Sequence, residues 1–200
     1  SFIKIFDEIC TLDLKIMASL YIISGCNGAG KTTASFTVLP EILNCREFVN
    51  ADEIARGLSP FKPESVAIQA GKIMLGRIEE LIKQNADFAI ETTLTTKSYL
   101  NTIKKAKELG YHVTLLFFWL NNVELAIERV KTRVQEGGHH IPEGVIRRRY
   151  KKGIENLNKF ITAVDFWFVL DNSKEDLNFI AEGNKNAIVI FEEEKWKILS

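Results

Sequence analysis

The sequence predicts an α/β domain in which helices flank a parallel sheet. Apolar runs of strand length alternate with longer segments of helical period, and this alternation is typical of strand-helix-strand units. Most of these runs are uninterrupted, as expected of strands that are covered on both faces. With 200 residues, 46% of them hydrophobic, the chain can build one compact core. We therefore expect a single domain over residues 19–200, preceded by an N-terminal extension over residues 1–18.

The spacing of apolar residues predicts the strands and helices. The expected strands are the apolar runs at residues 20–24, 47–50, 88–91, 112–120, 166–170 and 187–191. Apolar residues at steps of three and four predict helices over residues 64–83, 98–109, 123–136 and 143–160. Residues 192–194 are three consecutive glutamates, which we interpret as a solvated turn.

Composition narrows the class of protein. The 26 Lys and Arg residues balance the 26 Asp and Glu residues, so we expect neither nucleic acid nor a membrane surface as a partner. The longest apolar run, residues 113–120, falls short of the roughly 18 residues of a membrane helix, which predicts a soluble protein. Cys10, Cys26 and Cys45 form no CxxC pair, which favours reduced thiols in a cytoplasmic protein without zinc.

The strongest motif lies between the first strand and the next helix. Residues 25–32 fit GxxxxGK[ST] at every defined position, and the alternative reading is a glycine-rich turn that binds nothing. Glycines let successive N–H groups turn inward around phosphate oxygens, and the helix N-terminus adds partial positive charge. Lys31 would reach the β and γ phosphates of ATP, and the Thr32 hydroxyl would bind Mg²⁺. The residues expected to bind nucleotide are Gly25, Cys26, Asn27, Gly28, Ala29, Gly30, Lys31, Thr32 and Thr33.

Missing signatures disfavour two classes of nucleotide-binding protein. Neither Asn158-Lys159 nor Asn184-Lys185 continues as the guanine-reading NKxD motif, so a GTPase is disfavoured. A Ser-Gly-Gly signature of transporter-type ATPases is also missing from the sequence. Asp171 ends an apolar strand and could imitate the acidic strand end of such an ATPase, so its role stays open.

Carboxylates follow the second and third strands, at the edge of a parallel sheet where ligands bind. Asp52 could accept the proton of an attacking hydroxyl, or it could cap the helix that begins before Ile54. Glu91 could hydrogen-bond the acceptor or a magnesium-bound water. Thr92 and Thr93 could contact the acceptor, or they could cap the following helix.

Arginines flank a glycine-containing loop, which predicts a lid over residues 134–147. Arg133 precedes the loop, and Arg147, Arg148 and Arg149 follow it on the next helix. Arginines near the γ phosphate stabilise the charge of the transferred group. Consecutive helical residues point about 100° apart, so only one or two of the three can face the phosphates. His139 and His140 lie in the lid, where a solvated histidine is the simpler interpretation.

With these residues in view, the chain resembles the zeta toxin family of P-loop kinases, in particular its short bacterial branch described as predicted ATPases. The resemblance covers residues 20–173 and is carried by five motifs, which are residues 25–32, 50–60, 91–93, 137–142 and 147–150. It implies an adenylate-kinase-like core, with Asp52 as general base and Glu91 and Thr93 as acceptor contacts. It also implies that Arg133 and either Arg147 or Arg148 grip the transferred phosphate.

The resemblance also implies ligands and partners. Asn172, after the fifth strand, would lie near the adenine. Better-known members phosphorylate the 3′-hydroxyl of UDP-N-acetylglucosamine and are inhibited by a small antitoxin protein, although this chain departs from them around the acceptor pocket and the lid. Our leading hypothesis is an ATP- and Mg²⁺-dependent kinase of a small-molecule hydroxyl. The alternatives are a regulatory module that hydrolyses ATP slowly and, third, a kinase of nucleic-acid ends, for which the sequence offers no basic bias.

Overall fold

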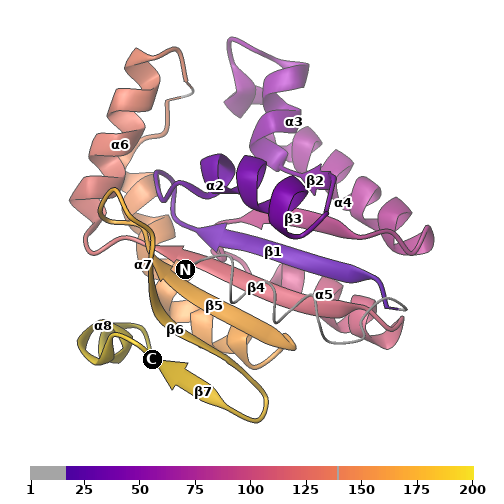
Figure 1. The fold of residues 1–200 in the computed structure, drawn as a ribbon. Helices are drawn as coiled ribbons and strands as arrows, with labels where there is room; N and C mark the ends of the chain where they lie inside the picture. Colours follow the sequence, from indigo (N-terminus) through magenta and orange to yellow (C-terminus); the bar gives the residue numbers. More distant parts are fainter. Residues whose placement is uncertain (1–16, 139) are drawn as a thin grey trace.

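The computed structural model describes residues 17–138 and 140–200, so most of the expected N-terminal extension and His139 lie outside it. A seven-stranded sheet with the order β2-β3-β1-β4-β5-β6-β7 forms its centre (Figure 1). The strands are β1 (Ser19–Gly25), β2 (Glu47–Val49), β3 (Phe88–Thr92), β4 (His112–Trp119), β5 (Phe166–Asp171), β6 (Asn178–Asn184) and β7 (Ile188–Ile190).

The predicted fold class is confirmed, with one difference at the end of the sheet. The five strands from β2 to β5 in the sheet order pair in parallel, whereas β6 and β7 pair antiparallel. The sequence analysis missed β6, because Asn178, Glu182 and Gly183 interrupt its apolar pattern. This strand forms by pairing with β5 across a register shift after Val169, and such pairing leaves no local signal.

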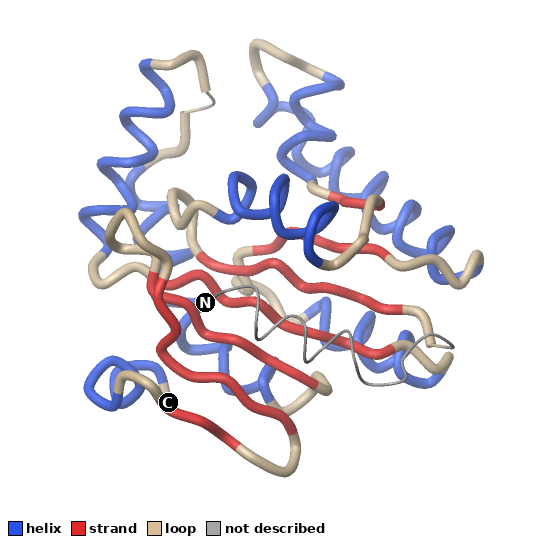
Figure 2. The backbone as a smooth tube through the Cα atoms, viewed as in Figure 1, coloured by secondary structure: helices blue, strands red, loops and turns tan. Residues whose placement is uncertain are grey.

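Helices cover the sheet on both sides (Figure 2). The helical segments are α2 (Lys31–Thr37), η1 (Val38–Ile42), α3 (Ala51–Leu58), η2 (Pro63–Val66), α4 (Ala67–Lys83), α5 (Ser98–Glu108), α6 (Val123–Gln135), α7 (Glu143–Ile161) and α8 (Glu193–Leu199). The turn expected at residues 192–194 is wrong, because Glu193 and Glu194 form the first turn of α8. Acidic residues suit this position, since a helix N-terminus carries partial positive charge.

Two hydrophobic cores follow from the alternation of side chains along the strands. In β1, Leu20 and Ile22 point to one core, while Tyr21 and Ile23 point to the other. The first core is covered by α4, α5, α7 and α8, and the second by α2, η1, α6 and the start of α7. Figure 1 shows α2 on the near side of the sheet and α5 and α7 behind it. Both faces of the central strands are therefore closed to water, and ligand access is left to the edges and loops.

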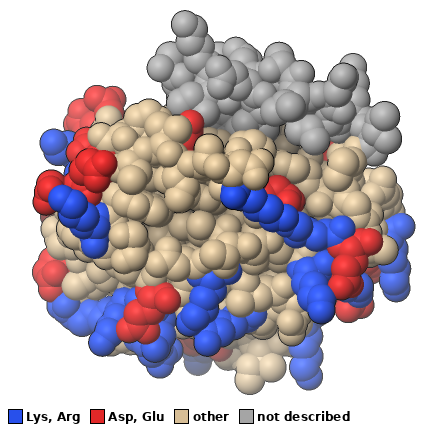
Figure 3. All heavy atoms as spheres, turned by 90° about the horizontal axis from the view of Figure 1, so that it is seen from below, with Lys and Arg blue, Asp and Glu red and all other residues tan. Residues whose placement is uncertain are grey.

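The carboxyl ends of the parallel strands bring three segments to one edge of the sheet. The glycine-containing loop follows β1, the start of α3 follows β2, and Glu91 lies in β3. On the face seen in Figure 3, basic and acidic side chains lie side by side around a largely uncharged middle. Within residues 17–138 and 140–200, no helix combines the length and the apolarity that crossing a membrane requires.

Candidate functional site

The loop between β1 and α2 is pressed against its neighbours so closely that glycine is required. Gly28 has φ 80°, and a Cβ built on it would lie 2.6 Å from the backbone oxygen of Ala126 in α6. Gly30 has φ 81°, and a Cβ there would meet the side chain of Asn172. Both positions lie in the left-handed region that favours glycine. The loop is therefore shaped by α6 and the β5–β6 loop as well as by its own residues.

The start of α2 is suited to an anion. Gly30 occupies the N-cap position, and no side chain among the described residues caps this helix. The N–H groups of the first helical turn have no intrahelical acceptor, and the helix dipole adds partial positive charge there. Lys31 brings a full positive charge to the same place, and its amine donates to the backbone oxygen of Cys26 at 2.9 Å. A phosphate group matches this donor set.

Glu91 joins the three segments that meet at this edge. Its carboxylate accepts a hydrogen bond from the Thr32 hydroxyl at 2.7 Å and one from Asn50 Nδ2 at 2.9 Å. Lys31 Nζ lies 3.4 Å from the other carboxylate oxygen, and the two side chains are only 5% and 8% exposed. We call Lys31, Thr32, Asn50 and Glu91 the Glu91 cluster. Because the ion pair is buried, replacing either partner should destabilise the protein, since the remaining charge would have no counter-charge.

The donor set of the Glu91 cluster fits a magnesium–ATP complex. Magnesium prefers oxygen ligands and takes few of them from protein, and a hydroxyl beside a carboxylate offers such oxygens. Thr32 and Glu91 are the residues that would hold the ion, directly or through water. Of the two sequence interpretations of Glu91, its contact with Thr32 favours the magnesium side over the acceptor.

Asp52 does not cap α3, so this alternative is wrong. Asn50 is the N-cap, and its Oδ1 accepts from the Asp52 backbone N–H at 2.8 Å. The Asp52 side chain is exposed in the first turn of α3, and the described residues provide no hydrogen bond or ion pair to its carboxylate. Its oxygens are therefore available to a ligand, and its role as general base remains a prediction.

Thr92 and Thr93 do not cap a helix either. The next helix, α5, begins at Ser98 after an N-cap without a side-chain hydrogen bond. The Thr92 hydroxyl instead accepts from the Leu94 backbone N–H at 3.2 Å, and the hydroxyls of Thr93 and Thr95 lie 2.6 Å apart. We call residues 92–96, which carry four threonines, the hydroxyl loop.

Among the lid arginines, the structure brings Arg149 onto the phosphate-binding loop, whereas the family resemblance pointed to Arg147 or Arg148. Arg149 Nη1 donates to Asn27 Oδ1 at 2.9 Å. Arg147 pairs instead with Glu124 at 2.6 Å, and Arg148 is exposed. Residues 136–138 and 140–142 contain neither helix nor strand. Spacing along a helix could not select among three consecutive arginines, since the selection depends on how α7 is rotated against β1.

Arg133 ends α6 next to the loop, where the Gly138 backbone N–H donates to the Arg133 backbone oxygen at 2.8 Å. The chain therefore folds back onto Arg133 at this point. Exposed His140 follows in the loop, in keeping with its interpretation as a solvated histidine. The roles of Arg133, Arg147 and Arg148 in catalysis remain predictions.

The segment after β5 contacts the phosphate-binding loop from the other side. Asn172 Nδ2 donates to the backbone oxygen of Ala29 at 2.8 Å, next to the loop glycines. Arg129 of α6, which the sequence analysis did not select, donates to the backbone oxygen of Asn172 at 2.8 Å. The motif alone could not have found Arg129, because its partner lies 43 residues away in the chain.

Asp171, whose role the sequence left open, has a structural role. Burial raises its pKa, but hydrogen bonds from Ser173 and Lys195 outweigh this and hold the pKa of the carboxyl below its usual value. Lys195 Nζ in α8 lies 3.0 Å from Asp171 Oδ2. The carboxylate is thus occupied by protein groups that fix the start of the β5–β6 loop. These contacts oppose the reading of Asp171 as the acidic strand end of a transporter-type ATPase.

The thiol of Cys26, in the phosphate-binding loop, is unreactive near neutral pH. Burial raises the pKa of Cys26 to about 11, although Lys31 acts in the opposite direction. Since the thiolate is the nucleophilic form, Cys26 is protonated near neutral pH and is unreactive. Burial likewise raises the pKa of Tyr150 to about 12, and its hydroxyl donates to the backbone oxygen of Leu120 at 2.8 Å. Both groups are therefore structural parts of the site.

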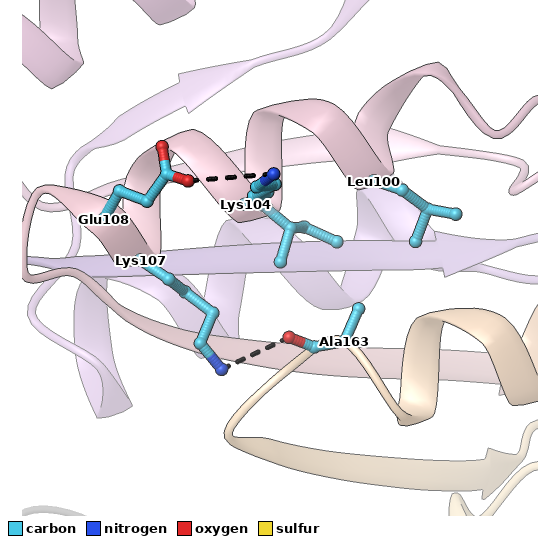
Figure 4. Close-up of a pocket in the computed structure, with 6 residues that line it drawn as sticks. Leu100, Lys104, Lys107, Glu108 and Ala163 are labelled. Carbon is cyan, nitrogen blue, oxygen red and sulfur yellow. Dashed lines mark hydrogen bonds and ion pairs between the residues drawn. The ribbon is translucent and has the colours of Figure 1, made fainter.

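A surface hollow lies elsewhere and does not belong to this site. It has a volume of about 420 Å³ and is lined by α5 side chains and Ala163 before β5 (Figure 4). Lys107 donates to the backbone oxygen of Ala163 at 3.2 Å there, and Lys104 and Glu108 lie 3.9 Å apart. The lining is mostly apolar and carries no group of the predicted chemistry.

The fold and the phosphate-binding loop define the class, which is a P-loop protein with a mostly parallel sheet between helices. A family model described as "Zeta toxin" matches residues 15–186. The chain therefore belongs to the zeta toxin family, and the resemblance drawn from the motifs is confirmed. A protein of Haemophilus influenzae described as "Uncharacterized protein" is 35% identical over 126 residues, which are 63% of this chain and 88% of that protein.

Solved structures share the fold at low sequence identity. The AvrRxo1-ORF1:-ORF2 structure with ATP has a TM-score of 0.72 and 17% identity, covering 98% of this chain and 70% of that chain. The structure from the PezAT toxin-antitoxin system of Streptococcus pneumoniae has a TM-score of 0.67 and 17% identity, covering 94% and 84%. Shikimate kinase of Acinetobacter baumannii has a TM-score of 0.50 and 17% identity, covering 93% of each chain. The family and these folds support an ATP-using, phosphotransferase-like activity.

Proposed function

We propose that this protein transfers the γ-phosphate of ATP to a hydroxyl group of a small molecule, with UDP-N-acetylglucosamine as the first acceptor to test. The Glu91 cluster carries the proposal, because it links the phosphate-binding loop to the segment after β2 and to the end of β3. Membership of the zeta toxin family supports the same chemistry. The hydroxyl loop follows directly in the chain and offers donors and acceptors to a polar acceptor molecule.

In the proposed reaction, the acceptor oxygen forms a bond to the γ-phosphorus as the bond from phosphorus to the ADP oxygen breaks. The proton of the acceptor hydroxyl passes to the Asp52 carboxylate, which is exposed and has no protein partner among the described residues. General base catalysis of this kind contributes roughly 10² to 10⁴ in rate. Catalysis otherwise depends on positioning and on stabilising negative charge.

Positive groups on the donor side stabilise that charge. Lys31 lies at the start of α2, and Arg149 contacts the phosphate-binding loop through Asn27. Arg133 is proposed as a second arginine of the transferred phosphate, as the family resemblance implies. Magnesium, when bound at Thr32 and Glu91, supplies further positive charge to the phosphate oxygens. We propose that Asn172 lies beside the nucleotide base, since it borders the phosphate-binding loop.

We also propose a cytoplasmic reaction and an antitoxin protein as a partner. The cytoplasm supplies ATP and keeps thiols reduced, and the two described cysteines, Cys26 and Cys45, are free and buried. The antitoxin is suggested by the PezAT toxin-antitoxin system, whose structure shares the fold. Co-expression with candidate antitoxin proteins would test the partner, because an antitoxin should restore growth that the chain alone suppresses.

A transfer assay tests the main proposal. Purified protein is incubated with magnesium, labelled ATP and a panel of nucleotide sugars and nucleosides, and the wild type is compared with Asp52→Asn. We expect one acceptor to gain label, and the substitution to lower that rate by roughly 10² to 10⁴ because the base is lost. Transfer would be measured by separating labelled product from ATP.

Glu53→Gln is the matched control, because Glu53 is the neighbouring exposed carboxylate in the first turn of the same helix. We expect this variant to transfer phosphate at the wild-type rate. If ATP turns over equally in wild type and Asp52→Asn while the whole panel stays unlabelled, the regulatory ATPase described above replaces the kinase.

A further inference from the structure

One face of α7 contacts both sides of the candidate site. Arg149, Gly153 and Asn156 follow each other at helical spacing and therefore lie on one stripe of the helix. Arg149 Nη1 donates to Asn27 Oδ1 in the phosphate-binding loop at 2.9 Å. Asn156 Nδ2 donates to the backbone oxygen of Leu94 in the hydroxyl loop at 2.8 Å. A single rigid element thus touches the donor loop at one point and the hydroxyl loop at another.

The contact between α7 and the hydroxyl loop is a close approach of two backbones. A Cβ built on Gly153 would lie 3.0 Å from the backbone oxygen of Thr93. This separation is tighter than nine in ten real Cβ contacts, so a side chain at this position would require the loop to shift by a few tenths of an ångström. Gly153 is buried, although glycine is unfavourable inside a helix. Its presence is explained by the space that the loop requires.

The hydroxyl loop has a conformation that needs outside support. Leu94 is fully buried and has φ 53°, which is unusual for a residue with a branched side chain. Asn156 is itself only 5% exposed, and its amide reaches the backbone oxygen of Thr95 at 3.4 Å as well as that of Leu94. Buried amide donors are stable only when they are satisfied, so Asn156 and the loop depend on each other.

We propose that Asn156 and Gly153 are positioning residues, which set the distance between the acceptor on the hydroxyl loop and the phosphate on the donor loop. This inference rests on the proposed phosphoryl transfer. The reacting atoms must come within about 3–3.5 Å in aligned geometry, and a misplacement of about 1 Å costs on the order of 10² in rate. Neither residue touches the reacting groups. Both act through the loop that α7 holds.

Asn156→Leu tests the hydrogen bonds, because it removes the amide donors and keeps a side chain of similar size. We expect kcat for transfer to the labelled acceptor to fall on the order of 10²-fold. The KM for ATP and the acceptor-free hydrolysis of ATP should stay within about twofold of wild type, because the donor loop is unaltered. Asn158→Leu is the matched control, since Asn158 is exposed on the same helix.

Gly153→Ala tests the close approach in a variant that favours folding, because alanine is a better helix former than glycine. Gly144→Ala is its control, since a Cβ at Gly144 would meet nothing within 4 Å. We expect Gly153→Ala to lower transfer, and the Gly144 variant to match wild type. The inference is overturned if transfer is unchanged in both test variants, or if transfer and acceptor-free hydrolysis fall in proportion, as general destabilisation would produce.

Hydrogen exchange separates this inference from the proposed function, because it needs no acceptor. The backbone amides of residues 93–97 should exchange roughly tenfold faster or more in Asn156→Leu than in wild type, while Asn158→Leu matches wild type. Should the wild type phosphorylate no compound of the panel, the proposed function fails, and this measurement alone decides the role of α7. Equal exchange rates in wild type, Asn156→Leu and Asn158→Leu would refute the proposed positioning role of α7.

Discussion

The phosphate-binding loop and the segment from α3 to α4 are built differently. In the first region the functional side chains are buried, with Lys31 at 5% and Asn27 at 4% exposure. In the second, apolar side chains face water, with Phe61 at 97% and Ile68 at 81% exposure. The comparison teaches that the phosphate-binding loop is packed in advance, whereas the segment from α3 to α4 keeps apolar surface exposed.

The largest expected effect is on the buried donor side. Lys31→Met should lower ATP turnover on the order of 10²- to 10³-fold, because it removes a positioned donor for the phosphate charge. The variant should also be less stable, because Glu91 loses its cationic partner and keeps only the hydrogen bonds from Thr32 and Asn50. Initial rates with labelled ATP would measure turnover, and circular dichroism would measure folding. Lys151→Met, on an exposed lysine of α7, serves as the control, and equal rates for both variants would remove Lys31 from the mechanism.

A smaller effect tests which arginine serves the donor side. Arg149→Ala should lower turnover on the order of tenfold or more, because it removes a cation and leaves Asn27 without its partner. Arg148→Ala should have a much weaker effect, since this side chain is exposed. Steady-state rates and ATP affinity of the two variants would be compared. The reverse order of effects would restore our original choice and would mean that α7 rotates when nucleotide binds.

The smallest effect is expected in the exposed segment from α3 to α4. Phe61→Ala should change the free energy of unfolding by no more than about 0.5 kcal/mol, because the ring is almost fully exposed. Phe88→Ala, in the fully buried core, should cost roughly 3–5 kcal/mol. Urea denaturation would give both values. A large loss for Phe61→Ala would show that this tip is covered in solution, and the contrast between the two regions would disappear.

The sequence predicted the strand, the loop and the helix around Gly28 because their determinants are local. The motif around Gly28, the strand before it and the helix after it are consecutive in the chain, and one pattern identifies all three. Glu91 was selected for a similar reason, since the end of a parallel strand has a known position in this fold class. The structure adds that Glu91 contacts Lys31 and Thr32, a detail that depends on how β3 and β1 pair.

Errors occurred where a residue depends on partners that are distant in sequence. The caps assigned to Asp52 and Thr92 as alternatives failed because a cap is decided by the residue that the backbone path brings to the helix start, which is Asn50 for α3. Arg149 was passed over because helix rotation has no signature in a run of three arginines. Strand β6 was missed because its stability comes from pairing with β5.

By itself, the sequence determined the α/β class, the phosphate-binding loop and the family, because alternating periodicity and a contiguous motif are properties of neighbouring residues. Tertiary structure alone decided which side chains meet at the edge of the sheet: Asn50 and Thr32 on Glu91, Arg149 on Asn27, and Asn156 on Leu94. These contacts join residues that are far apart in the chain, so they exist only after the strands have paired and the helices have packed against them.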